Sequence, residues 1–446
     1  MDFPSSRPTP RSWFLPLIFA IGAMLLPLLT APLAVQAESF VTVATYDGVI
    51  NPVSAEYLHD ALLSAQESGA QALIIRLNTP GGLDSSMRLI IQDITAAAIP
   101  VIVYVSPSSG RAASAGVFIT MAAHIAAMAP GTNIGAAHPV AMGGGELDKT
   151  MKEKMENDTV AYLKSIAAQR ERNVAWAEDA VRKSVSVTEG EALKLKVINL
   201  VAENIPALLK HLDGRSIALP NGPTVLHTAT AAVRDFPMGL RLELLKTLSD
   251  PNIAYLLMTI GTVGLIAELY NPGAILPGVV GAISLILAFY SFQSLPINYA
   301  GVMLFLLGIV FFILEASITS YGLLGIGGAV SMLLGSVMLI KTDVEFFQIS
   351  WSVILPVVAL TALFSLFMVG MGIRAMRQRP VTGREEMIGL VGIAKTALTP
   401  HGQLAVHGEL WEAVSDHPLK PGDEAEVTGV EGLRLHVKPY SQQKEA

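Results

Sequence analysis

The chain has 446 residues and a formal net charge of −7; hydrophobic residues make up 52% and charged residues only 15%. Soluble domains usually contain about a quarter charged residues, so this composition excludes a single soluble globule. The negative charge argues against nucleic acid as a partner. Cysteine is absent, which excludes disulfides, thiolate nucleophiles and cysteine-ligated metals. We expect neither a metal site nor a cofactor.

The first 37 residues have the pattern of a secretory signal peptide. Arg7 and Arg11 precede an apolar run from Trp13 to Leu33, and the small residues Val35 and Ala37 follow. A basic start, an apolar middle and small residues at the end predict cleavage after Ala37. The alternative is an uncleaved membrane anchor. In both cases the chain that follows is exported.

Residues 38–230 are predicted to form a soluble α/β domain. Strand-like runs begin at Phe40, Ala72 and Pro100, and the segments between them have helical periodicity. Strands that alternate with helices at this spacing predict stacked βαβ units and a mainly parallel sheet. Thr188 and Glu191 have the spacing of a capping box before a further short helix. Residues 231–250 are expected to be a linker.

Two loops rich in small residues follow predicted strands, at Asn78 to Leu83 and at Gly110 to Gly116. In the second, Ser114 lies among alanines and glycine at the start of an apolar helix. The hydroxyl of a serine there is uncrowded, and the first N–H groups of the helix can bind a developing oxyanion. The alternative is that the small residues only permit close helix packing.

The order of the motifs resembles the membrane-bound, ClpP-class serine proteases of the NfeD family. The strand that ends in Asn78-Thr-Pro-Gly-Gly82 is followed by Ala112-Ala-Ser-Ala-Gly116, by Ala129-Pro-Gly-Thr-Asn-Ile-Gly135 and by the segment from Thr188 to Ala202. The long form of this family joins a signal peptide, a ClpP/crotonase-like α/β domain, a multi-span helical membrane domain and a small OB-like all-β barrel. Lys196 departs from the family pattern, which usually has glycine there, and this puts the local turn in question.

The resemblance implies a Ser–Lys dyad, with Ser114 as the nucleophile and Lys154 as the general base. A lysine can act as a base only when neutral, so its pKa would have to fall from about 10.4 toward about 7 or 8 by desolvation. Lys152 lies two residues away on the same predicted helix and faces elsewhere. The oxyanion donors would be the N–H of Ala115 and that of Gly81 or Gly82.

His138 is the alternative base. It follows Ser114 by 24 residues, which is close to the Ser-to-His spacing of soluble ClpP, and histidine titrates near neutrality without burial. The ClpP triad also needs an aspartate, but residues 186–191 offer only glutamate. His124, which precedes a strand-like run, is expected to be structural.

Residues 251–375 are predicted to cross the membrane about five times. Glu268 and Glu315 are the only charged residues between positions 251 and 340. Proline and glycine divide the tract into spans of suitable length, at about 252–270, 273–293, 298–317, 322–340 and 350–374. The surroundings of Glu268 recur 47 residues later around Glu315, so each repeat is a helical hairpin. Both glutamates are candidates for a function, and both could instead bond to a neighbouring helix.

Charge and the number of spans predict the orientation. An odd number of spans carries the C-terminus back to the cytoplasm, and Arg374, Arg377 and Arg379 after the last span agree with the positive-inside rule. The chain should therefore lie in the cell's inner membrane, with the protease domain outside.

Five short β-rich pieces between residues 380 and 442 predict the small OB-like barrel. From residue 380 onward the chain has ten acidic and six basic residues, which favours a protein partner over nucleic acid.

Two functions are consistent with the sequence. The first is a membrane-anchored serine endopeptidase that cleaves apolar segments of membrane-associated proteins, with stomatin-like proteins as the substrates or partners that the resemblance implies. The second is a non-catalytic membrane scaffold that organises stomatin- or flotillin-like partners. The pairing of Ser114 with Lys154 favours the first. We also expect a homo-oligomer.

Overall fold

The computed structural model describes residue 2 and residues 39–140, 148–270, 273, 275–293, 295–318, 320–342, 344–377 and 386–441. Apart from residue 2, the predicted signal peptide lies outside these ranges, as does Arg379. The chain divides into two compact units. The first comprises Met1–Asn298 with Ile340–Ser350, and the second comprises Tyr299–Leu339 with Trp351–Ala446.

The first unit contains a six-stranded sheet in which all neighbouring strands are parallel, in the order β11-β1-β2-β3-β5-β8. The strands are β1 (Phe40–Asp47), β2 (Leu73–Asn78), β3 (Val101–Val105), β5 (Ile125–Met128), β8 (Leu200–Val201) and β11 (Ala232–Phe236). The predicted α/β fold is therefore confirmed.

Residues 231–250 are not a linker. They contain β11, which pairs with β1 from Phe40 and Ala232 to Ala44 and Phe236, and helix α9 (Leu240–Leu248). The edge position of β11 depends on a partner far away in the sequence, which local periodicity cannot reveal.

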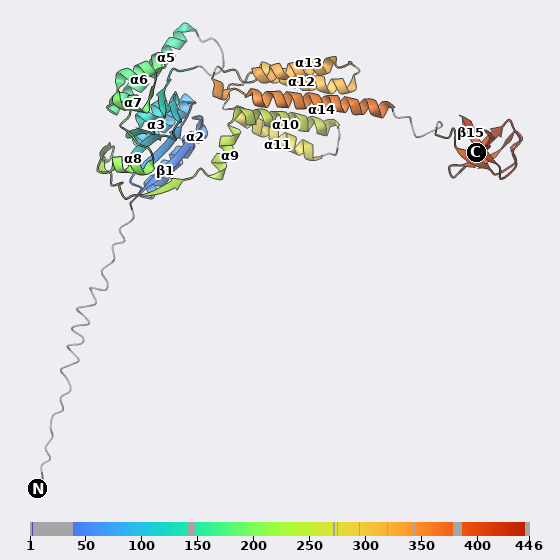
Figure 1. Cartoon of the computed structure of the whole chain (residues 1–446), viewed down its shortest axis with the longest axis horizontal. Helices are drawn as coiled ribbons and strands as arrows, with labels where there is room; N and C mark the ends of the chain where they lie inside the picture. The colour runs from blue at the N-terminus through green and yellow to red at the C-terminus, as the bar shows by residue number, and fades with distance from the viewer. Residues whose placement is uncertain are drawn as a thin grey trace. The chain divides into compact units, whose positions relative to one another are not determined.

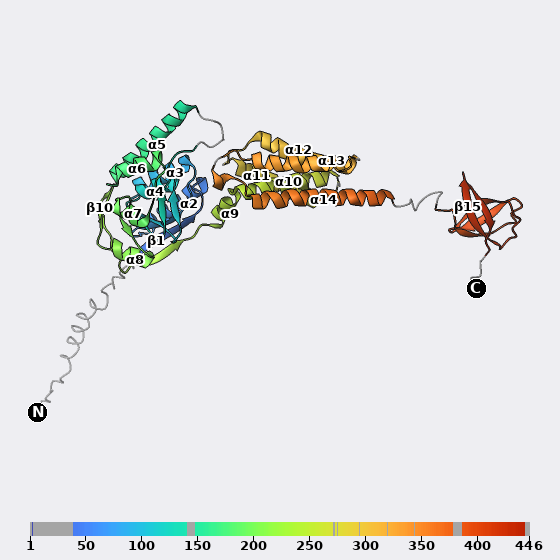
Figure 2. The same ribbon diagram turned by 45° about the horizontal axis from the view of Figure 1, so that its top comes forward.

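Both faces of this sheet are buried. Alternate residues of the strands belong to two separate apolar clusters, with Ile75 and Val103 in one and Ile74 and Ile102 in the other. Helices therefore cover both faces, as expected for a parallel sheet (Figures 1 and 2). The helices of this part are α2 (Pro52–Glu67), α3 (Asp84–Ala96), α4 (Ala115–Ala122), α5 (Lys149–Gln169), α6 (Val174–Arg182), α7 (Glu189–Lys194) and α8 (Ile205–Leu212).

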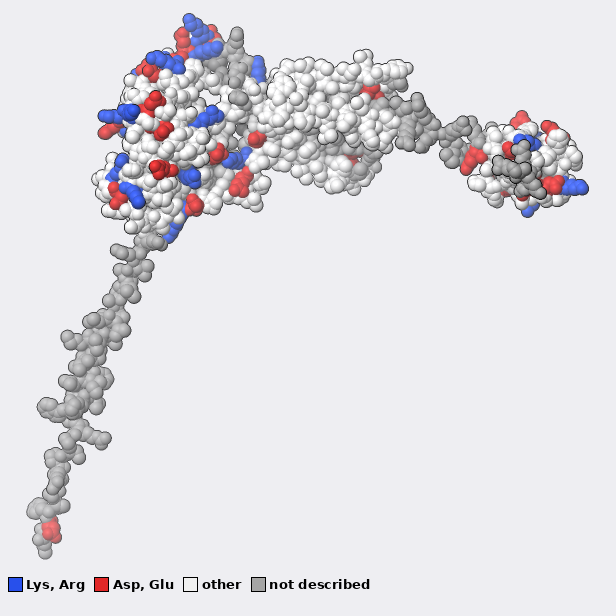
Figure 3. Space-filling model, viewed as in Figure 1, with Lys and Arg blue, Asp and Glu red and all other residues white. Residues whose placement is uncertain are grey.

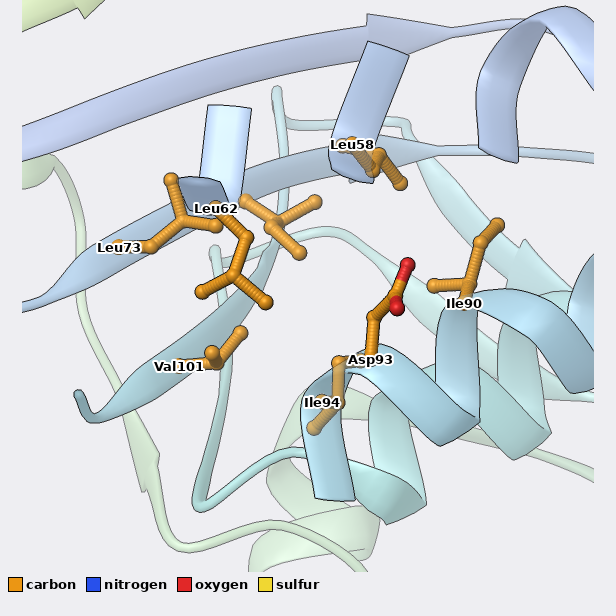
Figure 4. Close-up of a pocket in the computed structure, with 8 residues that line it drawn as sticks. Leu58, Leu62, Leu73, Ile90, Asp93, Ile94 and Val101 are labelled. Atoms are coloured by element: carbon orange, nitrogen blue, oxygen red, sulfur yellow. The ribbon is translucent and has the colours of Figure 1, made fainter. Parts of the chain in front are cut away.

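Figure 4 shows a small cavity between α2, α3 and the strands β2 and β3. Its volume is about 10 Å³, hardly enough for one water molecule, and its lining is apolar apart from Asp93. The Asp93 carboxylate lies 3.0 Å from Nδ1 of His59. The cavity is thus a packing gap.

Two smaller sheets complete the α/β part. One contains β4 (Arg111–Ala113), β6 (Asn133–Gly135) and β7 (Ser186–Thr188), and the other pairs β9 (Ser216–Leu219) with β10 (Gly222–Val225).

Lys196 ends α7 without disturbing the turn. The predicted capping box forms between Thr188 and Glu191 at the start of this helix. At its end Lys196 has φ 59°, its N–H donates to the carbonyl of Leu193, and the N–H of Val197 donates to that of Ala192. These are the two bonds of a Schellman motif, in which lysine takes the left-handed position that usually favours glycine.

Five long apolar helices follow the α/β part. They are α10 (Pro251–Tyr270) and α11 (Ile275–Phe292) in the first unit, and α12 (Tyr299–Ser317), α13 (Leu323–Met338) and α14 (Trp351–Arg377) in the second. Among the described residues, α10 and α11 have the length and hydropathy to cross a membrane, and the other three contain shorter apolar stretches. The visible surface of these helices carries almost no charged side chains, whereas the α/β part and the barrel carry many (Figure 3).

The 47-residue repeat is visible in how each hairpin packs. In α10–α11, a Cβ on Gly281 would lie 2.9 Å from the carbonyl oxygen of Gly261. In α12–α13, a Cβ on Gly328 would lie 3.0 Å from that of Gly308. Each hairpin therefore closes through a pair of glycines at equivalent positions, as is typical of helix contacts in membranes.

Glu315 binds the start of the following helix. Its carboxylate accepts hydrogen bonds from the N–H groups of Gly322 and Gly325, both at 2.9 Å, and from the hydroxyl of Ser320. Glu268 has the equivalent place in the first hairpin, where Oε1 accepts a bond of 3.4 Å from the N–H of Gly273. These contacts favour a structural role for Glu315.

The C-terminal strands form a closed five-stranded barrel, as predicted, in the order β12-β13-β14-β16-β15. They are β12 (Val391–Ala394), β13 (His401–Val406), β14 (Glu409–Ser415), β15 (Glu424–Glu431) and β16 (Arg434–Pro439).

Candidate active site

Ser114 lies at the turn between strand β4 and helix α4. Its backbone has φ 49° and ψ −114°, a conformation that residues other than glycine rarely adopt. Its own N–H donates to the carbonyl of Gly135 at 3.1 Å, and its carbonyl accepts from the N–H of Val117 at 2.9 Å. Strain of this kind at a strand-to-helix turn is typical of an exposed nucleophile at the start of a helix.

The glycine loop after β2 lies directly against Ser114. A Cβ on Gly81 would be 2.7 Å from the Cβ of Ser114, and one on Gly82 would be 2.0 Å from the carbonyl oxygen of Ile50. Thr79 joins this loop to β4, because its N–H donates to the carbonyl of Arg111 at 2.8 Å. A larger residue at position 81 would therefore crowd the serine, and one at position 82 would clash with the backbone of Ile50.

The N–H groups of the two glycines differ in whether they have a hydrogen-bond acceptor. The N–H of Gly81 donates to the hydroxyl oxygen of Thr79 at 3.1 Å. The N–H of Gly82 has no acceptor within the described part of the chain. Ala115 is the first residue of α4, so its N–H has no acceptor within the helix. The donors that remain for an oxyanion are therefore the N–H groups of Gly82 and Ala115.

Two arginines hold the other end of α4. Arg172 is buried and donates to the carbonyl oxygens of Thr120 and Ala123 at 2.8 and 2.9 Å, and Arg170 donates to that of Ala122 at 2.8 Å. Burial lowers the pKa of Arg172 to about 9. His124 is structural, as expected: Nδ1 accepts the N–H of Val101 at 3.1 Å, and burial lowers the pKa of this histidine to about 4.

Replacing Arg172 by methionine is expected to destabilise the α/β part by about 3 kcal/mol, because buried carbonyl oxygens at the end of α4 would lose their donors. The free energy of unfolding of the full-length protein in detergent measures this. Arg241→Met is the control, since its ion pair with Glu56 is exposed and should be worth less than about 1 kcal/mol. Equal stability of the two variants would contradict the structural role of Arg172.

A cleft of about 450 Å³ opens beside Ser114. This volume lies within the usual range of ligand pockets. Most of its lining is apolar, with contributions from Leu83, Met87, Phe118, Val140 and Met155. Val344, Phe346 and Phe347, which come from the connection between α13 and α14, also line it.

The two candidate bases lie in different surroundings. His138 lines the cleft together with Ser114, and its Nδ1 lies 3.0 Å from the carbonyl oxygen of Val181. A carbonyl only accepts, so in the neutral ring Nδ1 carries the proton and Nε2 is the nitrogen that can accept one. Lys154 is exposed on α5 and does not line the cleft, although the next residue, Met155, does.

Arg88 is the one cation among the side chains that line the cleft in the described chain. Its guanidinium bonds to Asp84 at 2.8 Å and to Asp158 at 3.0 Å. An arginine cannot give up its proton at ordinary pH, so Arg88 fixes α5 against α3 and does not act as a base.

Several residues of the site were missed in the sequence. The hydroxyl of Thr79 and the carbonyl of Gly135 hold the loop and the serine. Both residues belong to the family motifs, but nothing in the sequence reveals these bonds. The aromatic residues Phe346 and Phe347 had no sequence signal, because they lie more than 200 residues from Ser114.

A strained serine at the start of a helix, free N–H groups beside it and an apolar cleft define a serine hydrolase, here joined to a membrane domain. Comparison with known proteins agrees with this class. Three family descriptions match the chain: NfeD1b N-terminal domain at residues 41–210, NfeD integral membrane domain at 252–371 and NfeD-like C-terminal, partner-binding domain at 384–439.

Two relatives match the chain over almost their full length. The membrane-bound protease PH1510 of Pyrococcus horikoshii is 37% identical over 90% of this chain and 94% of its own. The membrane protein NfeD1b of Bacillus subtilis is 28% identical over 94% of this chain and 97% of its own. A solved structure, described as the 1510-N membrane protease specific for a stomatin homolog from Pyrococcus horikoshii, is 36% identical, with a TM-score of 0.43, and covers 48% of this chain and all of the other. The chain belongs to the NfeD family.

Proposed function

We propose that this protein is a membrane-anchored serine endopeptidase with Ser114 as its nucleophile. The observation that carries the proposal is the strained turn at Ser114, which presents the hydroxyl to an apolar cleft at the start of α4. The family membership supports it, since the relative PH1510 is a membrane-bound protease.

The arrangement suits acyl transfer. Oγ of Ser114 attacks the carbonyl carbon of the scissile peptide bond while the general base takes the hydroxyl proton. The negative charge moves to the carbonyl oxygen, where the N–H groups of Ala115 and Gly82 stabilise it. The base then gives its proton to the leaving amine, and water hydrolyses the ester on Ser114 by the same steps in reverse order.

We assign the role of base to Lys154. It lies on the helix whose residues Met155, Asp158 and Thr159 line the cleft, and it is the lysine that the family resemblance implies for the dyad. Its side chain is exposed in this structure, so in this proposal Lys154 turns toward Ser114 when substrate binds. Catalytic hydrogen bonds often tighten only in the substrate complex. His138 is the second candidate, favoured by its place in the cleft.

The substrates that we propose are apolar segments of stomatin-like membrane proteins. The apolar lining of the cleft supports apolar side chains, and the solved relative is described as specific for a stomatin homolog. The barrel carries the family's description of a partner-binding domain. We propose that it binds such a partner in the cytoplasm, while the protease domain lies outside.

This orientation can be tested with cysteines, because the chain has none of its own. Gln348 and Tyr321 are both exposed, and they lie in connections at opposite ends of α13. A membrane-impermeant maleimide should label Gln348→Cys in intact cells, but Tyr321→Cys and Asp416→Cys in the barrel only after permeabilisation. Labelling of Gln348→Cys and Asp416→Cys from the same side would contradict a crossing by α14 and with it the proposed orientation.

The test of the enzymatic function is labelling of the purified full-length protein by a fluorophosphonate. One serine should become labelled, and Ser114→Ala should remove the label. A protein that neither labels nor cleaves would instead fit the non-catalytic scaffold.

A further inference from the structure

The connection between α13 and α14 reaches the candidate active site. Ile340–Ser350 belongs to the same compact unit as the α/β part, although it joins two membrane helices of the other unit. It contains a short 3₁₀ turn at Glu345–Phe347, where the ring centroids of Phe346 and Phe347 are 4.8 Å apart. We call residues 344–347 the aromatic turn.

Bonds at both ends hold this connection in place. At one end Ile340 forms an antiparallel bridge with Ile297, and the N–H of Lys341 donates to the carbonyl of Pro296 at 3.1 Å. At the other end the N–H of Ser350 donates to the side chain of Asn252 at 2.8 Å. The aromatic turn is therefore tied to the beginning of α10 and to the chain that follows α11.

The aromatic turn forms a wall beside the glycine loop. Phe346, Phe347 and Leu83 line the cleft that contains Ser114, and the same three residues line a second cavity of about 170 Å³. They thus separate the two cavities. Leu83 directly follows Gly82, the proposed oxyanion donor, and lines the same cleft as Ser114, so the wall lies close to where the scissile bond must bind.

Phe346 and Phe347 have different parts in this wall. Phe347 is 6% exposed and is part of the packing, whereas Phe346 is only partly buried. Val344, the other residue of the aromatic turn that lines the cleft, is also apolar. A partly exposed phenylalanine on the wall of a cleft can gain apolar contact when an apolar side chain enters.

We propose that the aromatic turn is a specificity element of the protease, in which Phe346 contacts the apolar side chain of the substrate residue next to the scissile bond. This inference rests on the proposed endopeptidase function. It means that the membrane domain supplies part of the substrate site and does more than anchor the enzyme. The excised α/β domain would lack this contact.

The test uses the full-length protein in detergent and two fluorogenic peptides that differ only in leucine or alanine on the acyl side of the scissile bond. Phe346→Ala should lower kcat/KM for the leucine peptide by about tenfold and for the alanine peptide by less than about threefold. The rate of labelling by a fluorophosphonate with a short alkyl chain should not change, because that reagent does not need the wall.

Two further variants keep the result clear. Phe289→Ala removes an equally large, exposed ring from α11 outside the cleft and should match the parent on both peptides. Phe346→Leu keeps an apolar wall and should restore most of the preference for leucine.

The outcomes separate the inference from the function on which it rests. If the parent cleaves and labels but Phe346→Ala keeps its preference for leucine, the specificity role is wrong and the protease stands. If Phe346→Ala cleaves both peptides and labels several times faster, the aromatic turn covers the site and does not recognise substrate, which also overturns the inference. A parent that neither labels nor cleaves overturns both.

Discussion

Ser114→Ala is expected to abolish peptide cleavage, with a loss on the order of 10⁴-fold or more in kcat/KM. The substitution removes the only atom that forms the covalent bond with the substrate and leaves the oxyanion donors and the cleft unchanged. The measurement is the initial rate of cleavage of an apolar peptide by the purified full-length protein.

The fold of this variant should be intact. Alanine at position 114 keeps the backbone hydrogen bond to Gly135 and loses only a hydroxyl group. The midpoint temperature of thermal unfolding should therefore change by less than a few degrees. Ser108→Ala is the matched control, because Ser108 is exposed in the loop before β4 and does not line the cleft. Cleavage by Ser114→Ala at the rate of the Ser108→Ala control would show that another residue is the nucleophile.

Much of the fold could be predicted because its signals are local. The parallel strands, the capping box at Thr188 and the five strands of the barrel each follow from short patterns of apolar, small or capping residues. The repeat was also visible, since Gly281 and Gly328 occur 47 residues apart in similar sequences. Such patterns need no knowledge of the rest of the chain.

The remaining features depend on distant parts of the chain. β11 is a strand because β1 offers it an edge, and the segment by itself resembles a linker. The choice between the N–H groups of Gly81 and Gly82 depends on where the hydroxyl of Thr79 points. The aromatic turn reaches the cleft only because both ends of its connection are bonded to the chain at Ile297 and Asn252. A sequence pattern predicts the serine and its loop, but it does not predict the aromatic turn that lines the other side of the cleft.

Lys154→Ala is expected to lower kcat/KM by about 10²-fold to 10⁴-fold, which is the usual contribution of a general base. Lys152→Ala is the matched control, because Lys152 is equally exposed and lies two residues earlier on α5. It should keep most of the activity if only Lys154 reaches Ser114. Similar losses in both variants would instead indicate that the first turns of α5 act through their overall charge.

The pH profile distinguishes Lys154 from His138. Only the unprotonated base can take the serine proton, so kcat/KM must rise with pH through the apparent pKa of the essential base in the free enzyme. With a lysine as base this rise should lie above neutrality, and with a histidine it should lie at about pH 6.5, the ordinary pKa of that side chain. His138→Ala should therefore keep both the activity and the profile of the parent. If His138→Ala is inactive while Lys154→Ala remains active with a rise near neutrality, the base is His138. Nε2 is then the nitrogen that accepts the proton, because Nδ1 bonds to the carbonyl of Val181.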